Sequence, residues 1–425
     1  MEVQVISNEI IKPSSPTPDH LRHYQLSFLD QVTPKAYNPF LYYYELSDDH
    51  NIADISLKLK KSLSQALTLY YPLAGRYIDD AFVDCNDAGI PYSEARVAAE
   101  TKLTDVLNNP VPRELNKLIP FEQDEIGEPL LGVQINAFAC GGIAIGVCIS
   151  HGVADALSSL MFTRSWMAIA RGEHGAVPPP EFVSAGLFPP KDMRGYDTSF
   201  VIVKKDTVQS KRFVFGSPQI EALRTKYSQD GRRPSRVEAL SAFIWSRFAA
   251  AARATIELKT TASGQFPLVI ISHVVNIRPK FDPPLPEHSF GNLFRSSMTT
   301  PLTSSDELGL AKQIGDDIRK VDKEAVESFR MGGDEMVDSY KEGAERYAGG
   351  EVVSLVFTSL CRFPLYEADF GLGKPTWVSS AARCFKNMVG FMDNKAGDGI
   401  EAYVCLKPED MARFEADEEL LAFVS

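Results

Sequence analysis

Hydrophobic residues recur along the chain with two spacings, and these predict alternating helices and strands. Between residues 52 and 70, apolar side chains return every three or four positions, which predicts an amphipathic helix: Ile52, Ile55, Leu59, Leu63, Ala66, Leu67 and Tyr70. Two apolar runs, residues 130–139 and 143–149, flank a Cys-Gly-Gly turn at 140–142 and predict a β-hairpin. A further helix is expected over 156–170.

The second half of the chain shows the same mixture of elements. Ser235 and Glu238 form an S-x-x-E capping box that predicts a helix through about residue 252. Residues 266–277 read as a largely buried strand. Ser304 and Glu307 repeat the capping-box pattern ahead of a charged helix of roughly 20 residues. Helices interspersed with strands in both halves predict the α/β class, with α+β layers around mixed sheets.

Prolines divide the chain near its middle. Pro178-Pro179-Pro180 and Pro189-Pro190 cannot sustain a helix or a central strand, so residues 175–205 are expected to form an extended connection. A chain of 425 residues also exceeds the size of one ordinary core. We therefore predict two domains of similar size, residues 1–175 and 206–425, joined by a linker at 176–205.

Composition narrows the class of protein. The formal net charge of −12 opposes a role in binding nucleic acid or an anionic membrane, because both need strongly clustered basic surface. Six cysteines without a CxxC pair fit reduced thiols better than a disulfide framework, and no histidine cluster has metal-ligand spacing. Because no signal peptide or membrane-spanning run is recognisable, we expect a cytoplasmic protein without a metal.

The sharpest chemical motif is His151-Gly-Val-Ala-Asp155, between a predicted strand and a predicted helix. A strand end projects a side chain rigidly, and imidazole titrates near ~6.5, so His151 is the candidate general base. Asp155 either orients that imidazole or pins the loop through an ion pair elsewhere. The plainer interpretation is a packed histidine followed by an aspartate that favours the helix dipole.

A second motif is the sequence DFGLGKP at residues 369–375. Gly371 and Gly373 allow positive φ or a close backbone approach. The segment matches neither a dinucleotide fingerprint nor a P-loop. The plainer interpretation of the segment by itself is a tight structural turn.

Together these motifs resemble the BAHD acyltransferases, a plant family of coenzyme A-dependent enzymes, over nearly the whole chain. The landmarks that carry the resemblance are residues 11–18 (IKPSSPTP), 29–31 (LDQ), 70–76 (YYPLAGR), 151–155 (HGVAD), 275–278 (VNIR), 291–292 (GN) and 369–375. The opening and the VDCND segment at 83–87 look most like the vinorine synthase-like branch.

The resemblance implies a two-domain fold like chloramphenicol acetyltransferase, with a channel at the domain interface. It gives Asp155 a structural role with Arg278 as its partner, and makes the loop containing Asp369, Gly371 and Gly373 a support of the coenzyme channel. Position in the family also places three residues near the coenzyme, Lys211, Ser235 and Arg236. Thr358 would contact the developing oxyanion.

The expected activity is acetyl transfer from acetyl-CoA, a co-substrate, to a hydroxyl of a plant alkaloid or terpenoid alcohol. We expect a monomer with no tightly bound cofactor. The alternatives are an N-acyltransferase acting on an amine and a non-catalytic binding protein on the same scaffold, while the lack of a GxSxG motif disfavours a hydrolase. Leu360 and Leu372 stand where the family usually has tryptophan. They predict a roomier acceptor pocket, or merely a rearranged core.

Overall fold

A computed structural model of the chain describes residues 1–46, 51–79, 81–123, 125, 127–257, 267–301 and 307–424. They form two compact units. The first comprises Met1–Lys191, Pro286–Leu293 and Pro364–Ala382, and the second comprises Asp192–Leu285, Phe294–Phe363 and Arg383–Ser425. This division differs from a simple split at the linker, because two segments of the second half belong to the first unit. The Asp369–Gly373 loop accordingly lies in the first unit and not in a C-terminal domain.

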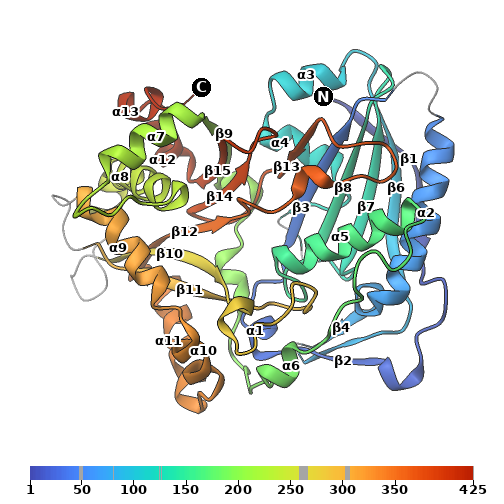
Figure 1. Cartoon of the computed structure of the whole chain (residues 1–425), viewed down its shortest axis with the longest axis horizontal. Helices are drawn as coiled ribbons and strands as arrows, with labels where there is room; N and C mark the ends of the chain where they lie inside the picture. Colours follow the sequence, from blue (N-terminus) through green and yellow to red (C-terminus); the bar gives the residue numbers. More distant parts are fainter. Residues whose placement is uncertain are drawn as a thin grey trace. The chain divides into compact units, whose positions relative to one another are not determined.

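A mixed six-stranded sheet forms the centre of the first unit (Figure 1). Its strands are, in spatial order, β1 (Val3–Ile11), β6 (Ile90–Val97), β7 (Leu131–Ala137), β8 (Ile143–Ser150), β3 (Tyr37–Tyr44) and β13 (Trp377–Ser379). Only β6 and β7 run parallel. A smaller sheet contains β2 (His23–Gln25), β5 (Phe82–Asp84) and β4 (Arg76–Ile78).

The described residues of the first unit also form α-helices (Figure 1). They are α1 (Phe28–Gln31), α2 (Ile52–Leu69), α3 (Leu103–Asn108), α4 (Pro112–Leu115), α5 (Ala156–Ala170) and α6 (Ser184–Leu187). The two long helices, α2 and α5, contact each other, and the Trp166 indole N–H of α5 donates to the Leu59 carbonyl of α2 at 3.2 Å. Both β3 and β8 are buried at every position, as expected for strands in the middle of a covered sheet.

The second unit contains another mixed six-stranded sheet. Its order is β11 (Phe294–Thr299), β10 (Leu268–Asn276), β12 (Val352–Ser359), β14 (Met388–Asp393), β15 (Ile400–Leu406) and β9 (Gln209–Phe215). The pairs β10/β12 and β12/β14 are parallel and the others antiparallel. Two mixed sheets with flanking helices confirm the predicted α/β class.

Seven helices of the described residues accompany the second sheet. They are α7 (Ser217–Lys226), α8 (Arg236–Glu257), α9 (Glu307–Arg319), α10 (Lys323–Arg330), α11 (Asp334–Ala348), α12 (Pro408–Glu415) and α13 (Glu418–Leu421). Helix α8 contacts α7, α9, α12 and α13, so its apolar residues form the middle of this unit's core.

Several predicted elements have the expected limits, and others need correction. Helices α2 and α5 and the β7–β8 hairpin match their predictions closely. The prediction of a single charged helix of roughly 20 residues is wrong. Helix α9 ends at Arg319, and Asp322 caps a separate helix, α10. Ser304, the proposed start of that helix, lies outside the described residues. The 175–205 connection is mostly irregular, yet it contains the helical turn α6.

No disulfide joins any of the six cysteines, four of which are buried. Within the described ranges, no helix is both long and apolar enough to cross a membrane.

Candidate active site

His151 lies immediately after β8, where the strand leaves the sheet. In the β3/β8 ladder Tyr37 pairs with Ser150, and the His151 main-chain nitrogen donates to the Ala36 carbonyl at 2.8 Å. This bond extends the ladder by one residue. Strand β8 is buried throughout, whereas His151 is partly exposed, so this residue lies at the end of a rigid inner strand of the sheet.

The loop after His151 leaves no space for a larger residue at position 152. A Cβ on Gly152 would lie 2.4 Å from the Tyr77 hydroxyl, which itself is 2.9 Å from Ser150 Oγ. The Lys35 ammonium lies 4.2 Å from the centre of the Tyr77 ring. These contacts fix the turn that follows the candidate base.

Asp155 caps α5 and also bonds to a segment distant in sequence. Its Oδ1 accepts from the Ser158 main-chain nitrogen at 2.8 Å, and its Oδ2 accepts from the Leu293 main-chain nitrogen at 3.0 Å. The carboxylate therefore connects the start of α5 to the segment that contains Leu293 through hydrogen bonds to main-chain nitrogens. Arg278 is buried, and its Nη1 donates to Asn276 Oδ1 at 3.2 Å. The Asp155–Arg278 ion pair stays a prediction.

The distant segment, Gly291–Leu293, contacts the first turn of α5 through Ser158. Ser158 Oγ donates to the Gly291 carbonyl at 2.9 Å and lies 3.1 Å from the Gly291 nitrogen, which donates back to it. Gly291 has φ +126°, and a Cβ there would lie 2.6 Å from Ser184 Oγ. Only glycine fits this backbone and this space.

Asn292 connects His151 to a buried acid. Its Nδ2 donates to the His151 carbonyl at 2.7 Å and to Asp30 Oδ1 at 2.9 Å. Sequence reasoning noted both Asp30 and Asn292 as family landmarks but gave neither a role. One signal was available for Asp30, since Ser27 and Asp30 have capping-box spacing and form that box in α1.

Asp30 is an almost fully buried carboxylate with four hydrogen bonds. Ser27 donates its main-chain N–H and its hydroxyl to Oδ2 at 2.8 and 2.6 Å, while Asn292 donates its main-chain and side-chain N–H groups to Oδ1. Burial raises the pKa of Asp30 from 3.8 to about 6, although the bonds from Ser27 and Asn292 act in the opposite direction.

The Asp369 loop is held by its own aspartate. Asp369 Oδ1 accepts from the main-chain nitrogens of Gly371, Leu372 and Gly373 at 2.6, 3.0 and 3.0 Å. The two glycines have φ values of +83° and +81°, which residues with a side chain rarely adopt. Phe370 is buried beside Trp166, with ring centroids 4.7 Å apart. The Asp369 carboxylate thus stabilises the conformation of the loop.

The residues predicted near the coenzyme lie in the second unit and have protein partners. Lys211 of β9 forms an ion pair with Glu415, and Arg236 at the start of α8 pairs with Asp393 at 2.8 Å. Ser235 Oγ accepts from the Glu238 nitrogen at 3.2 Å, which bears out the predicted capping box. A phosphate at these basic side chains would compete with carboxylates.

Thr358 and the two leucines at tryptophan positions occupy different environments. Thr358 is half-buried in β12 opposite Gly390 of β14. Leu360 is 6% exposed, and its main-chain nitrogen donates to the Phe391 carbonyl at 2.8 Å. Leu372 is half-buried in the Asp369 loop.

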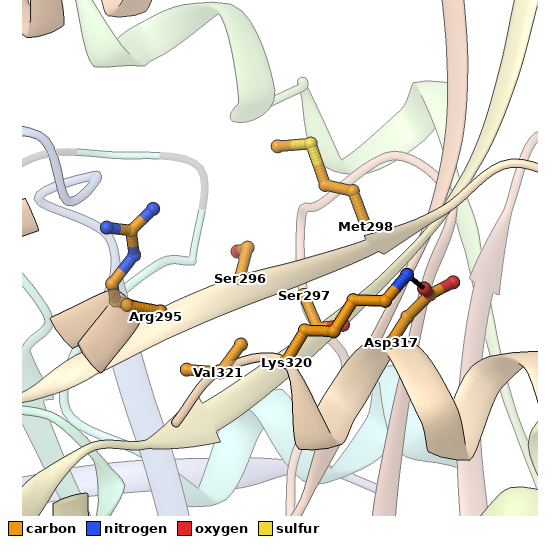
Figure 2. A pocket seen from close by; sticks show the side chains of 8 residues that line it. Arg295, Ser296, Ser297, Met298, Asp317, Lys320 and Val321 are labelled. Carbon is orange, nitrogen blue, oxygen red and sulfur yellow. Dashed lines mark hydrogen bonds and ion pairs between the residues drawn. The ribbon is translucent and has the colours of Figure 1, made fainter. Parts of the chain in front are cut away.

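The second unit also contains a cavity of about 260 Å³ that includes none of the predicted site residues (Figure 2). It is lined by Arg295, Ser296, Ser297, Met298, Asp317, Lys320, Val321 and Ala325. Both cations already have partners: the Arg295 guanidinium lies 3.5 Å from the Phe329 ring centre, and Lys320 pairs with Asp317 at 2.7 Å.

Comparison with known proteins decides the family. The sequence model of the Transferase family matches residues 1–421. The chain belongs to the Transferase family. This confirms the predicted BAHD membership, and within the Transferase family the chain is an acyl-CoA-dependent acyltransferase that takes acyl-CoA as its co-substrate.

Relatives in this family match the chain from end to end. A limonoid 21-O-acetyltransferase of Melia azedarach is 39% identical, with 100% of this chain and 99% of the relative covered. Stemmadenine O-acetyltransferase of Catharanthus roseus is 34% identical over 98% of this chain and 97% of the relative. The crystal structure of vinorine synthase is similar with a TM-score of 0.85 and 32% identity, covering 100% and 99% of the two chains.

Proposed function

We propose that the chain transfers an acetyl group from acetyl-CoA to a hydroxyl of a polycyclic plant metabolite, with His151 as the general base. The observation that supports this role most is the fixed main chain of His151. Its N–H donates to the Ala36 carbonyl and its C=O accepts from Asn292, while its side chain remains partly exposed. A general base must be held in place and accessible to its substrate, and the two main-chain bonds and the partial exposure of His151 support this role.

In the proposed reaction, neutral His151 removes the acceptor proton as the hydroxyl oxygen attacks the thioester carbonyl. The C–O bond forms and the carbonyl becomes a tetrahedral oxyanion, for which the Thr358 hydroxyl is the proposed donor. Collapse of this intermediate breaks the C–S bond. The imidazolium then returns the proton to the thiolate of coenzyme A, so that no covalent acyl-enzyme forms.

Coenzyme binding is assigned to Lys211, Ser235 and Arg236, with the loop of Asp369, Gly371 and Gly373 as structural support. The basic side chains would exchange carboxylate partners for phosphate, an equally good acceptor of charged hydrogen bonds. Asp155 and Arg278 are proposed to be structural partners.

The proposed acceptor is an oxygenated terpenoid alcohol of the limonoid kind. A limonoid 21-O-acetyltransferase is 39% identical to this chain, whereas stemmadenine O-acetyltransferase is 34% identical. The second candidate is therefore an alkaloid alcohol. We further propose a monomer that works in the cytoplasm.

The test is incubation of the purified chain with acetyl-CoA and three acceptors: a limonoid alcohol, an indole alkaloid alcohol and a polycyclic amine. Released thiol and product mass are followed together. We expect an O-acetyl product, with turnover at least ~100-fold lower in His151→Ala. A folded His151→Ala variant that turns over like the wild type would disprove the role of the base. Acetylation of the amine alone would indicate an N-acyltransferase, and binding without any product a non-catalytic protein.

A further inference from the structure

The segment Gly291–Leu293 enters the first unit from the second half of the chain and is tied down at each residue. The three main-chain nitrogens donate in turn to Ser158 Oγ, Asp30 Oδ1 and Asp155 Oδ2, at 3.1, 3.0 and 3.0 Å. These three bonds would hold the backbone of the segment without the Asn292 side chain. The side chain is therefore not needed to hold the segment.

The orientation of the Asn292 amide follows from its surroundings. Its nitrogen faces two oxygens that can only accept, the His151 carbonyl and an Asp30 carboxylate oxygen. The flipped amide would put three acceptors together, so the network itself assigns the nitrogen. Asn292 Oδ1 is buried and has no hydrogen-bond partner among the described residues. Since an unpaired buried carbonyl is destabilising, stability alone does not explain asparagine at this position.

Asp30 fixes that amide from the other side. Its Oδ1 takes both bonds from Asn292, and its Oδ2 takes both bonds from Ser27. Bonds to a carboxylate are shorter and stronger than neutral ones, and Asp30 is 1% exposed, so water does not compete. The Asn292 side chain is thus held in one rotamer.

The other end of this chain of bonds is the main chain of His151. The Ala36 carbonyl holds its N–H and Asn292 holds its C=O, so both peptide planes that flank the imidazole are fixed. A displacement of about 1 Å at a reacting group lowers rates by up to ~10²-fold. Loss of the bond from Asn292 to the His151 carbonyl removes one of the two restraints, the one on the peptide plane that follows His151.

We propose that Asn292 and Asp30 are positioning residues for the candidate base: Asp30 orients the Asn292 amide, and the amide holds the carbonyl of His151. Neither residue is proposed to touch the reacting atoms. The catalytic part of the proposal rests on the proposed function, whereas the geometric part, the placement of His151, does not.

The decisive variant is Asn292→Ala, which removes the side-chain bonds and keeps all three main-chain bonds of the segment. Its matched control is Ser27→Ala, which removes one bond from the same carboxylate on the opposite oxygen. In the control, Asp30 retains its bonds from the Ser27 nitrogen and from Asn292. Asp30→Asn is the conservative variant, since its amide oxygen still accepts from Asn292.

Turnover is measured with acetyl-CoA and the best acceptor of the panel. We expect kcat in Asn292→Ala to fall by ~10 to 100-fold with the KM for acetyl-CoA unchanged, and kcat in Asp30→Asn to fall less. Ser27→Ala should lower the melting temperature and leave kcat within about twofold. If Asn292→Ala and Ser27→Ala lose stability alike and both retain kcat, the two residues are merely structural and the proposal is overturned.

An acceptor-independent measurement separates this proposal from the proposed function. Two-dimensional NMR of histidine-labelled protein reports the ring tautomer and titration of His151, whose signals are assigned by their loss in His151→Ala. We expect these signals to shift or broaden in Asn292→Ala and to match the wild type in Ser27→Ala. Unchanged His151 signals in folded Asn292→Ala overturn the positioning role. Changed signals in a protein without acetyl transfer support the geometry and count against the proposed function.

Discussion

The Asp155 carboxylate accepts a hydrogen bond of 3.0 Å from the main-chain nitrogen of Leu293. The same carboxylate caps α5, so one side chain joins the HxxxD loop to a segment that lies 138 positions further along the chain. This arrangement makes the aspartate of the motif a structural link as well as a helix cap.

Replacement of Asp155 by alanine should therefore cost more than an ordinary cap. Asp155→Ala removes the cap, worth ~1 kcal/mol, and leaves the Leu293 N–H without its acceptor at a further ~1–3 kcal/mol. Thermal unfolding measures this loss against Asp322→Ala, which removes only the cap of α10. Equal changes in melting temperature for the two variants would show that the bond to Leu293 adds nothing.

Asp369→Ala should distort the loop that we assign to coenzyme support. Three main-chain N–H groups lose their shared acceptor, so we expect lower thermal stability and a several-fold higher KM for acetyl-CoA, with kcat less affected. Asp369→Asn retains an acceptor oxygen and should restore most of both values. If the Asp369→Ala variant is destabilised but has a normal KM for acetyl-CoA, the loop does not support coenzyme binding.

Arg236→Ala tests the proposed phosphate contact. We expect the KM for acetyl-CoA to rise about tenfold, the equivalent of ~1.4 kcal/mol, with kcat nearly constant. Arg233→Ala is the control, because Arg233 is a neighbouring cation paired with Glu221 and has no assigned role. Similar changes in both variants would reflect the net charge of the region and refute a specific contact.

His273 makes stability sensitive to acid. Burial lowers the pKa of this imidazole from 6.5 to about 4, and its Nε2 lies 2.9 Å from Ser241 Oγ. Below pH ~6.5 His273 becomes protonated in the unfolded chain but stays neutral in the folded protein. The free energy of unfolding therefore decreases as pH falls from ~6.5 towards ~4, by up to about 3 kcal/mol. Denaturant unfolding across this range should show a flatter profile in His273→Gln than in the exposed control His174→Gln. Identical profiles would exclude His273 as the cause.

Leu360→Trp tests the acceptor pocket. We expect kcat/KM to fall more for a bulky polycyclic alcohol than for a small one, with the KM for acetyl-CoA unchanged, because an indole is larger than a leucine side chain and would narrow the proposed pocket. Leu360 is 6% exposed, so a stability loss of ~1–3 kcal/mol from overpacking is also expected. Leu372→Trp, at a half-buried loop position, is the comparison. Proportional losses for both alcohols would show that residue 360 does not shape the pocket.

Much of the fold was readable from local patterns. Helix α5 begins and ends where the sequence predicted, because Asp155 provides a cap and an apolar face follows it. The break between α9 and α10 was missed because charged residues continue through Lys320 and conceal the Asp322 cap.

The candidate site was predictable only in part. His151 and Asp155 form a local motif, whereas the bonds between Asp30 and Asn292 join residues 262 positions apart, a relationship that no spacing reveals. The partners of Lys211 and Arg236 are likewise distant in sequence. Sequence reasoning identified chemical groups, and the fold determined which of them meet.

The contribution of Pro286–Leu293 to the first unit has a consequence during synthesis of the chain. Residues Met1–Lys191 leave the ribosome first, and Asp192–Leu285 must follow before Asn292 exists. At ~5–20 residues per second, this interval lasts roughly 5–20 s. During that time the nascent chain has the candidate base His151 and Asp30 but lacks Asn292, the residue that connects them, so assembly of the site depends on translation continuing well beyond the midpoint of the chain.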